Sequence, residues 1–113
     1  MEKRKVEWLA GLIDGDGCFL ISKAGDASME ITMGIGDERA LKEIKQYVGG
    51  AVKARAGMKA FRYRLHNDEG MRVLIGIVNG EIRNPIRQAQ LKAVCEQKGI
   101  QYKAPAPLVY KSG

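Results

Sequence analysis

The sequence predicts an α+β fold in which helices cover one face of a four-stranded antiparallel sheet. Three observations support this prediction. Apolar residues recur at helical spacing in four segments, apolar and polar residues alternate in four short segments between them, and glycine-containing turns separate most of these elements. The expected order is helix, two strands, helix, two strands, helix and a last helix, which leaves the other sheet face free for a ligand.

The first helix and the first hairpin are expected in the N-terminal third of the chain. Apolar residues at helical spacing predict a helix over residues 3–14, which Gly15 and Gly17 are expected to end. Two β-type runs, residues 18–23 and 29–35, flank a turn and are expected to pair as a hairpin. The apolar positions of the helix are Val6, Leu9, Leu12 and Ile13.

A second helix and a second hairpin follow. Asp37 is a suitable N-cap for a helix over residues 38–48, and the pair Gly49-Gly50 is expected to stop it. Strands are then expected over residues 51–55 and 59–65, around a glycine-containing turn. The apolar face of the helix comprises Ala40, Leu41, Ile44 and Val48.

Two more helices are expected before the chain becomes extended. Asn67 or Asp68 can cap a third helix that ends near Val78, where an Asn-Gly pair breaks the pattern. Pro85 then opens a fourth helix that reaches about Lys98, because proline is tolerated in a first helical turn. A glycine follows each of these helices closely.

The charge of the chain favours an anionic partner. There are 19 Lys and Arg against 13 Asp and Glu, a net charge of +6 that suits nucleic acid, although a solvated basic surface explains the composition equally well. Cys18 and Cys95 lie far apart and His66 is the single histidine, so neither a disulfide framework nor a Cys- or His-rich metal site is expected. No apolar run approaches the roughly 20 residues that span a bilayer.

The most informative motif is LAGLIDGDG, at Leu9–Gly17. Gly11 and Gly15 are four residues apart and share one helix face, so two copies of this helix can bring their backbones close together. Asp16, just past the expected helix end, would then meet the equivalent carboxylate, and paired carboxylates suit Mg²⁺. Asp-Gly pairs are also common in turns, so a turn role is the alternative for Asp16.

This motif resembles the signature of the LAGLIDADG homing endonucleases and differs from it by Gly15 in place of the usual Ala. The segments ITMGIGDERAL, FRYRLHNDEGM and NGEIRNPIRQAQL resemble later landmarks of such repeats, so the likeness covers nearly the whole chain. The resemblance implies an αββαββα repeat with a saddle-like sheet. It also implies site-specific, metal-dependent hydrolysis of phosphodiester bonds in double-stranded DNA by two paired repeats.

The resemblance further implies roles for residues around the motif. Asp16 and the backbone carbonyl of Gly15 are expected to hold Mg²⁺ or Mn²⁺, with Ca²⁺ as a substitute that does not support cleavage. Asp14 is expected to be structural and to cap the helix–strand junction. Asp37 is expected near a metal-bound water, although its role as an N-cap is an equally good interpretation and one residue can serve both.

A basic residue near the start of the last helix is expected to stabilise charge at the scissile phosphate. Arg83 and Arg87 are the two candidates, and the resemblance does not decide between them. The position after Pro85, often Lys in relatives, is Ile86 in this chain.

Alternation along the strands predicts which side chains face DNA. Lys53, Arg55, Arg62 and Arg64 share one face, where arginine can contact guanine edges and both residue types can contact phosphates. A solvated sheet face is the alternative. The matching face of the first hairpin is less basic, and Glu30 can accept a hydrogen bond from cytosine. Its expected DNA contacts are Leu20, Ser22, Ala24, Ser28, Glu30, Thr32 and Gly34.

One motif supplies one carboxylate, so pairing through the first helix is expected, with a palindromic target for a homodimer. Residues 1–103 are expected to form the repeat and residues 104–113 an extended tail. The tail resembles the linker of two-repeat members, which favours an N-terminal half, and a natural homodimer is the alternative. Organellar introns are the usual source of such proteins, so a mitochondrion or chloroplast is expected. The expected interface residues are Trp8, Ala10, Gly11, Asp14 and Gly15.

Two other functions are compatible with the sequence. The first is a nucleic-acid-binding module that does not cut, such as an intron maturase that binds RNA or an inactive half-enzyme. The second is a protein-interaction domain whose glycine face is a plain dimer interface. Salt-sensitive DNA binding distinguishes the second from the others, because contacts to phosphates weaken steeply as salt rises.

Overall fold

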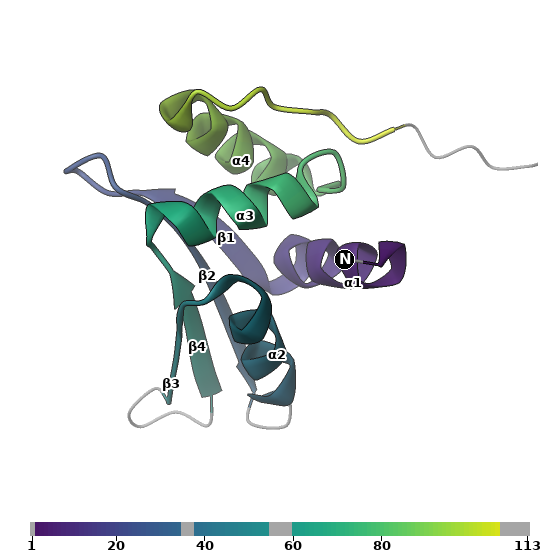
Figure 1. Cartoon of the computed structure of the whole chain (residues 1–113), viewed down its shortest axis with the longest axis vertical. Coiled ribbons are helices and arrows are strands. Elements are labelled where there is room, and N and C mark those ends of the chain that lie inside the picture. Colours follow the sequence, from purple (N-terminus) through teal and green to yellow (C-terminus); the bar gives the residue numbers. More distant parts are fainter. Residues whose placement is uncertain (1, 35–37, 55–59, 107–113) are drawn as a thin grey trace, which may run out of the picture.

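The computed structural model describes residues 2–34, 38–54 and 60–106 of the chain. Its elements follow the predicted order (Figure 1). The second and fourth helices have the predicted bounds, because clear stop signals flank both of them. The elements are α1 (Lys3–Asp16), β1 (Gly17–Ile21), β2 (Ala27–Gly34), α2 (Glu38–Val48), β3 (Ala51–Ala54), β4 (Ala60–Leu65), α3 (Asp68–Val78) and α4 (Pro85–Lys98).

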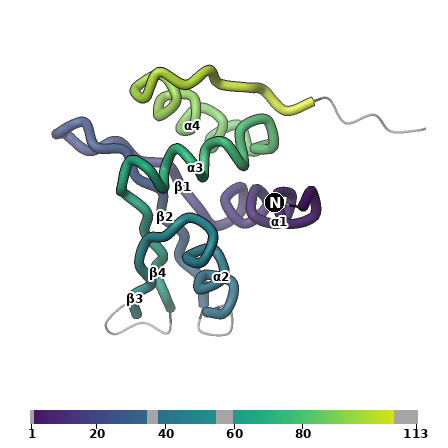
Figure 2. Tube along the Cα trace, viewed as in Figure 1, coloured from purple at the N-terminus to yellow at the C-terminus, as the bar shows by residue number. Residues whose placement is uncertain are grey.

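The four strands form one antiparallel sheet in the order β1-β2-β4-β3. The two hairpins are joined through β2 and β4, which place Ile31 opposite Tyr63. Helix α2 packs against β2, β3 and β4, helices α1 and α3 pack against β2, and α4 lies next to β1 (Figures 1 and 2). The predicted α+β fold is therefore confirmed.

The core lies between the helices and one face of this sheet. Met29, Ile31, Tyr63 and Leu65 are fully buried, and the residues between them on the same strands point to the other face, as strand geometry requires. The Tyr63 hydroxyl donates to the carbonyl of Gly49 at 2.6 Å, and burial raises the pKa of this tyrosine well above its usual value. The helices add Leu9, Ile13, Leu41, Ile44, Met71, Leu74, Ile75, Leu91 and Val94 to this core.

The first helix is longer than the sequence predicts. It continues past Asp14 to Asp16, because Gly15 keeps the helical pattern and the N–H of Gly17 still donates to the carbonyl of Ile13. A Cβ at Gly17 would lie 2.9 Å from the Cα of Ile13, so the chain needs glycine where the strand leaves the helix. Asp16 is therefore the last helical residue, and its predicted position beyond the helix is wrong.

The first hairpin also differs from its predicted bounds. Strand β1 ends at Ile21 and β2 begins at Ala27, so both strand boundaries at the turn come two residues earlier than predicted. The N–H of Ser22 donates to the carbonyl of Asp26 at 2.9 Å, and the N–H of Asp26 donates to the Ser22 hydroxyl at 3.0 Å. These local hydrogen bonds close the turn, and side chains that form such bonds favour turns over strands.

Beyond α4 the chain turns back and runs extended past α3 (Figures 1 and 2). The turn is at Gly99, which has a left-handed backbone. The Asn79 side chain then holds this segment, since its amide donates to the carbonyl of Gln101 and accepts from the N–H of Lys103, both at 2.8 Å. The extended conformation is thus observed as far as residue 106, and the predicted boundary between residues 103 and 104 stays a prediction.

Candidate functional site

The C-terminal end of α1 is the centre of the candidate site. Asp16 is exposed at the point where the helix joins β1, and Gly15 beside it is exposed too. Within the described residues, no group of three or more His, Cys, Asp or Glu side chains could hold a metal ion. Asp16 and the neighbouring backbone carbonyl are the oxygen atoms at this helix end, and two such groups alone would make only part of a metal coordination shell.

Asp14 fixes the end of α1 to the start of α4. Its carboxylate accepts from the backbone N–H groups of Arg83 and Asn84, all at 3.1 Å. The amide of Asn84 donates to the backbone carbonyl of Asp14 at 3.1 Å, and its oxygen caps α4 by accepting from Ile86 and Arg87. The structural role predicted for Asp14 is present, but it joins two distant helices, and its predicted place at the helix–strand junction is wrong.

The two candidate arginines have different surroundings. The Nε of Arg87 donates to the carbonyl of Ile13 at 3.4 Å, at the helix end where carbonyl groups carry partial negative charge. The Arg83 guanidinium instead donates to the carbonyl of Ala106 at 3.0 Å, in the extended segment. Burial raises the pKa of Cys18 on the sheet, and the charge of Arg87 opposes that rise, so Arg87 also lies near the sheet. Of the two, Arg87 is the arginine whose guanidinium bonds the end of α1.

The glycine face of α1 is open. Both Gly11 and Gly15 are exposed, and a Cβ added at either would have no other atom within 4 Å. A hollow of about 380 Å³ lies beside this face and is lined by Glu7, Gly11, Asp14, Glu81 and Arg83.

Two other predicted interface residues differ in their exposure. Trp8 is half-buried, with the ammonium of Lys5 5.0 Å from its ring centre. Ala10 is only 2% exposed and belongs to the core of this chain, because it lies on the α1 face that packs against the other elements. Its predicted place in a dimer interface is therefore wrong.

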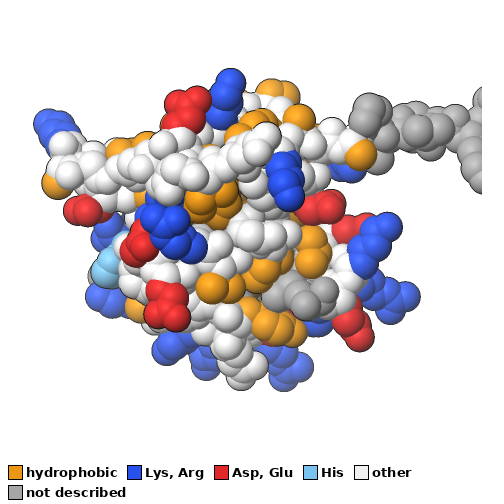
Figure 3. Space-filling model, turned by 45° about the horizontal axis from the view of Figure 1, so that its top comes forward, with side chains coloured by type: hydrophobic (Ala, Val, Ile, Leu, Met, Phe, Trp, Pro, Cys, Tyr) orange, Lys and Arg blue, Asp and Glu red, His pale blue; other side chains and the backbone are white. Residues whose placement is uncertain are grey.

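The open sheet face gathers most of the residues predicted to contact DNA. The strand register places Glu30 opposite Arg64 and Thr32 opposite Arg62, with Lys53 paired to Arg62 from the other side. Leu20 and Gly34 occupy the same face, as the alternation predicts. The basic side chains of this face are Lys53, Arg62 and Arg64, on β3 and β4. On the side of α3 and α4, acidic and basic side chains are intermixed (Figure 3).

The remaining predicted contacts have other positions. Ser28 points to the open face but is only 5% exposed, and it lines a surface hollow together with Arg64 and His66. Ser22 and Ala24 lie in or beside the exposed turn after β1. Asp37 and Arg55 lie outside the described residues.

A hollow of about 210 Å³ opens on the basic half of this face. Ala51, Lys53, Arg62, Arg64 and His66 line it. Arg64 faces the Glu30 carboxylate, with 3.5 Å between Nε and Oε1, whereas the buried Nε of Arg62 has no hydrogen-bond partner among the described groups. His66 continues the alternation of Arg62 and Arg64 past the strand end, which is the signal that could have added it to the predicted set.

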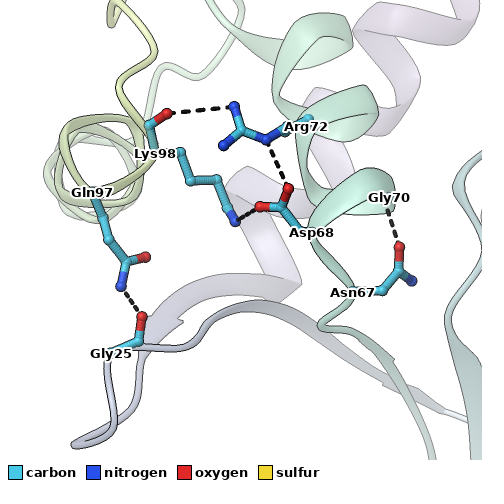
Figure 4. Close-up of polar contacts among 7 residues, drawn as sticks. All are labelled: Gly25, Asn67, Asp68, Gly70, Arg72, Gln97 and Lys98. Atoms are coloured by element: carbon cyan, nitrogen blue, oxygen red, sulfur yellow. Dashed lines mark hydrogen bonds and ion pairs between the residues drawn. The ribbon is translucent and has the colours of Figure 1, made fainter.

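A second polar cluster fixes the tip of the first hairpin (Figure 4). Asp68, the first residue of α3, contacts Arg72 at 2.8 Å and Lys98 at 2.6 Å, and these cations lower the pKa of its carboxyl group. Next to Lys98 on α4, the Gln97 amide donates to the carbonyl of Gly25 in the hairpin turn. The contacts of Lys98 and Gln97 join residues far apart in the sequence, and no pattern in the sequence predicted them, whereas Asp68 and Arg72 are neighbours on one helix.

The sequence and these elements match a known family. Residues 9–96, from the motif in α1 to the last turns of α4, match the family model described as LAGLIDADG endonuclease. The chain belongs to the LAGLIDADG endonuclease family. The resemblance found in the sequence is thereby confirmed. In the described part of this family member, no helix is long and apolar enough to cross a membrane.

The relatives of this LAGLIDADG chain are longer proteins. Intron-encoded RNA maturase bI4 of Saccharomyces cerevisiae is 53% identical over 102 residues, which are 90% of this chain and 16% of the relative. Intron-encoded DNA endonuclease ai2a of Dictyostelium discoideum is 43% identical over 111 residues, which are 98% of this chain and 36% of the relative. The chain thus spans well under half the length of either relative.

Solved structures support the fold. The homing endonuclease I-CvuI, in complex with its target and in the presence of calcium, superposes with a TM-score of 0.69 at 19% sequence identity. The match covers 86% of this chain and 68% of that chain. At this level of identity the likeness establishes that both chains share the LAGLIDADG fold.

Proposed function

We propose that this chain is one repeat of a site-specific endonuclease that hydrolyses phosphodiester bonds of double-stranded DNA when two repeats pair. One observation carries the proposal: the exposed Asp16 carboxylate ends a helix whose Gly11 and Gly15 face is open to a neighbour. A close approach of two such helices would bring two carboxylates together over one DNA substrate.

The pairing surface of this proposal follows α1. The open Gly11 and Gly15 positions permit the closest approach, with Trp8 and Asp14 at the sides and Ala10 left out because it is buried. The partner is either a second copy of this chain or a second repeat of a longer protein. In a homodimer the two DNA half-sites would be related by the two-fold axis, so the target would be palindromic or nearly so.

The oxygen ligands of this site fit a hard divalent cation. Asp16 and the carbonyl of Gly15 would hold Mg²⁺ or Mn²⁺, cations that prefer oxygen ligands and keep several waters. Ca²⁺ would bind without supporting cleavage. When bound, the ions would make a coordinated water more acidic and stabilise the leaving oxygen. The partial ligand set of one repeat agrees with this proposal, because the second Asp16 would complete it.

Other residues would position the DNA. Arg87, next to the end of α1, is better placed than Arg83 to neutralise the scissile phosphate, since the Arg83 guanidinium is bonded to Ala106. Asp37, which lies outside the described residues, would orient the attacking water. The open sheet face would bind the duplex through Lys53, Arg62 and Arg64.

The relatives add support from their names and titles. I-CvuI is described in complex with the I-CreI target with the DNA not cleaved, and the Dictyostelium relative is named as a DNA endonuclease. Both curated relatives are intron-encoded, which agrees with an organellar intron as the source of this chain.

The test is cleavage of a randomised duplex library by the purified chain with Mg²⁺. Asp16→Asn should abolish cutting and leave salt-sensitive DNA binding in place, whereas Glu96→Gln, a matched change on the exposed side of α4, should leave cutting unaltered. Enriched palindromic cuts would identify the homodimer. Full cutting by the Asp16→Asn chain would contradict the proposal.

A second candidate function is RNA binding as a maturase, because the 53% identical yeast relative is named as an RNA maturase. The same surface charge would then bind structured RNA. Competition between transfer RNA and duplex DNA at one salt concentration distinguishes the two functions. A clear preference for the RNA, without cutting of DNA, would favour the maturase.

A further inference from the structure

Glu30 and Arg64 form a pair at the middle of the open sheet face. They are directly opposed in the register of β2 and β4, and their row continues to Cys18 on one side and to Ala51 on the other. The Glu30 side chain is 20% exposed and that of Arg64 is 55% exposed. The carboxylate is therefore held low in the face, while the guanidinium extends above it.

The contact between these two side chains leaves useful groups free. It is given by the Nε of Arg64 and Oε1 of Glu30 at 3.5 Å, which is longer than a strong hydrogen bond, so the guanidinium and the carboxylate can each bind another partner. Because Ala51 is small, the hollow of about 210 Å³ opens beside Arg64 on the β3 side. The face thus presents hydrogen-bond donors on β4 next to an acceptor on β2.

A base pair in the major groove offers a matching pattern in only one case. Guanine presents two acceptors, N7 and O6, and the cytosine paired with it presents the N4 amino donor beside them. In an A·T pair, adenine presents an acceptor and a donor, and thymine adds an acceptor and a methyl group. Donors from arginine followed by an acceptor from glutamate therefore complement G·C in one orientation and oppose the other three arrangements.

We propose that Glu30 and Arg64 together read one oriented G·C base pair in each half-site, with guanine toward β4 and cytosine toward β2. This inference rests on the proposed function, since it assumes that a duplex lies on the open face. Glu30 has two roles in it: its carboxylate accepts from cytosine and also fixes the fork of Arg64. Lys53, on the neighbouring row, contacts phosphate and contributes affinity without sequence preference.

The experiment selects duplexes from a randomised library with the intact chain in Ca²⁺ and then compares variants on the selected duplex. The intact chain should require G·C in one orientation at one position of each half-site. Replacing that guanine with 7-deazaguanine, which lacks N7, should weaken binding on the order of 10-fold to 100-fold. Arg64→Lys should show the same loss on the natural duplex and no further loss with 7-deazaguanine, because lysine keeps the charge but not the fork.

Two further variants separate base reading from charge. Glu30→Gln should relax the preference against A·T at that position. Lys53→Ala should weaken binding to all sequences and reduce the salt dependence, with the G·C preference unchanged. Thermal unfolding of each variant checks that the fold persists, and the exposure of Arg64 favours its tolerance to substitution.

The possible failures differ in meaning. Two results would contradict the proposal that Glu30 and Arg64 read a G·C base pair, while leaving the endonuclease proposal intact. One is an Arg64→Lys chain that keeps the full G·C preference. The other is normal binding of the duplex whichever guanine is replaced with 7-deazaguanine. An intact chain without any salt-sensitive duplex binding would overturn both.

Discussion

The glycines within α1 and those at two junctions of the chain, Gly17 after α1 and Gly50 before β3, have opposite surroundings. A Cβ at Gly17 would lie 2.9 Å from the Cα of Ile13, and a Cβ at Gly50 would lie 2.7 Å from the carbonyl oxygen of Arg64. A Cβ at Gly11 or Gly15 would meet nothing within 4 Å. The first two glycines are required by contacts inside this chain. The other two are not, although glycine weakens a helix interior by about 0.5–1 kcal/mol relative to alanine.

This difference shows how a residue that serves contact with a partner can be recognised from the structure of one chain. A residue that costs stability and has no local reason points to a partner outside the chain. Gly76 on α3 is equally open but stands alone, whereas Gly11 and Gly15 share one face and adjoin the exposed Asp16. Alanine substitutions at different glycines can therefore test three effects separately. These are steric contact within the chain, strain of a left-handed backbone, and loss of the pairing surface.

The largest effect is expected for Gly50→Ala, where two costs combine. The backbone at this residue has φ of +95°, and the added Cβ would also meet Arg64 and the Tyr63 hydroxyl, which lies 2.8 Å away. Strain in this conformation and overpacking should together lower the free energy of unfolding by about 3 kcal/mol. Urea denaturation measures the change, and a loss below about 1 kcal/mol would mean that the turn relaxes without cost.

Gly17→Ala tests contact alone, because φ at Gly17 is −103° and allows any residue. The new Cβ would press on the backbone of Ile13, which cannot rotate away as a side chain could. Overpacking of this kind should destabilise the chain by about 2 kcal/mol. Since the contact lies at the junction of α1 and β1, the variant should also lose cleavage by displacing Asp16, and an unaltered cleavage rate would contradict that coupling.

Gly99→Ala tests conformation alone. Its φ is +70°, and no atom lies within 4 Å of the position of a Cβ. The cost of holding alanine in the left-handed region should lower the free energy of unfolding by about 1 kcal/mol. The same denaturation assay applies, and a loss equal to that of Gly50→Ala would show that contacts contribute little at either position.

Gly11→Ala should have the smallest effect on a single chain and act in the opposite direction. The unpaired chain should become more stable by about 0.5 kcal/mol, because alanine favours the helix interior. Pairing should weaken instead, as measured by sedimentation with duplex DNA. Gly76→Ala is the matched control, with the same helix gain and unchanged pairing, and equal pairing by both variants would contradict the proposed surface.

Much of the fold was predictable because its signals are local. The caps and stop signals around α2 and α4 gave their bounds, and alternation along β4 correctly placed Arg62 and Arg64 on the open face. The end of α1 was missed because glycine usually ends helices, whereas here the helical hydrogen bonds continue through Gly15.

The site was predictable only in part. The motif identified Asp16 and the glycine face, but burial decided against Ala10, and burial depends on neighbours from other elements. The bonds from Asp14 to Arg83 and Asn84 span about 70 residues of sequence, so no local pattern contains them. The Asp68 cluster with Lys98 was missed for the same reason.

The bonds between Asp14 and the start of α4 divide the molecule into a constant part and an adjustable part. Asp16, at the end of α1, and Arg87, in α4, lie on two helices that hydrogen bonds join directly. These bonds run from Asp14 to the start of α4 and from Arg87 to Ile13, and they do not involve the strands. The side chains proposed to contact DNA are carried by the sheet. In the proposed enzyme, target preference can therefore evolve, or be redesigned, by exchanging side chains on β2, β3 and β4 while Asp16 and Arg87 keep their positions.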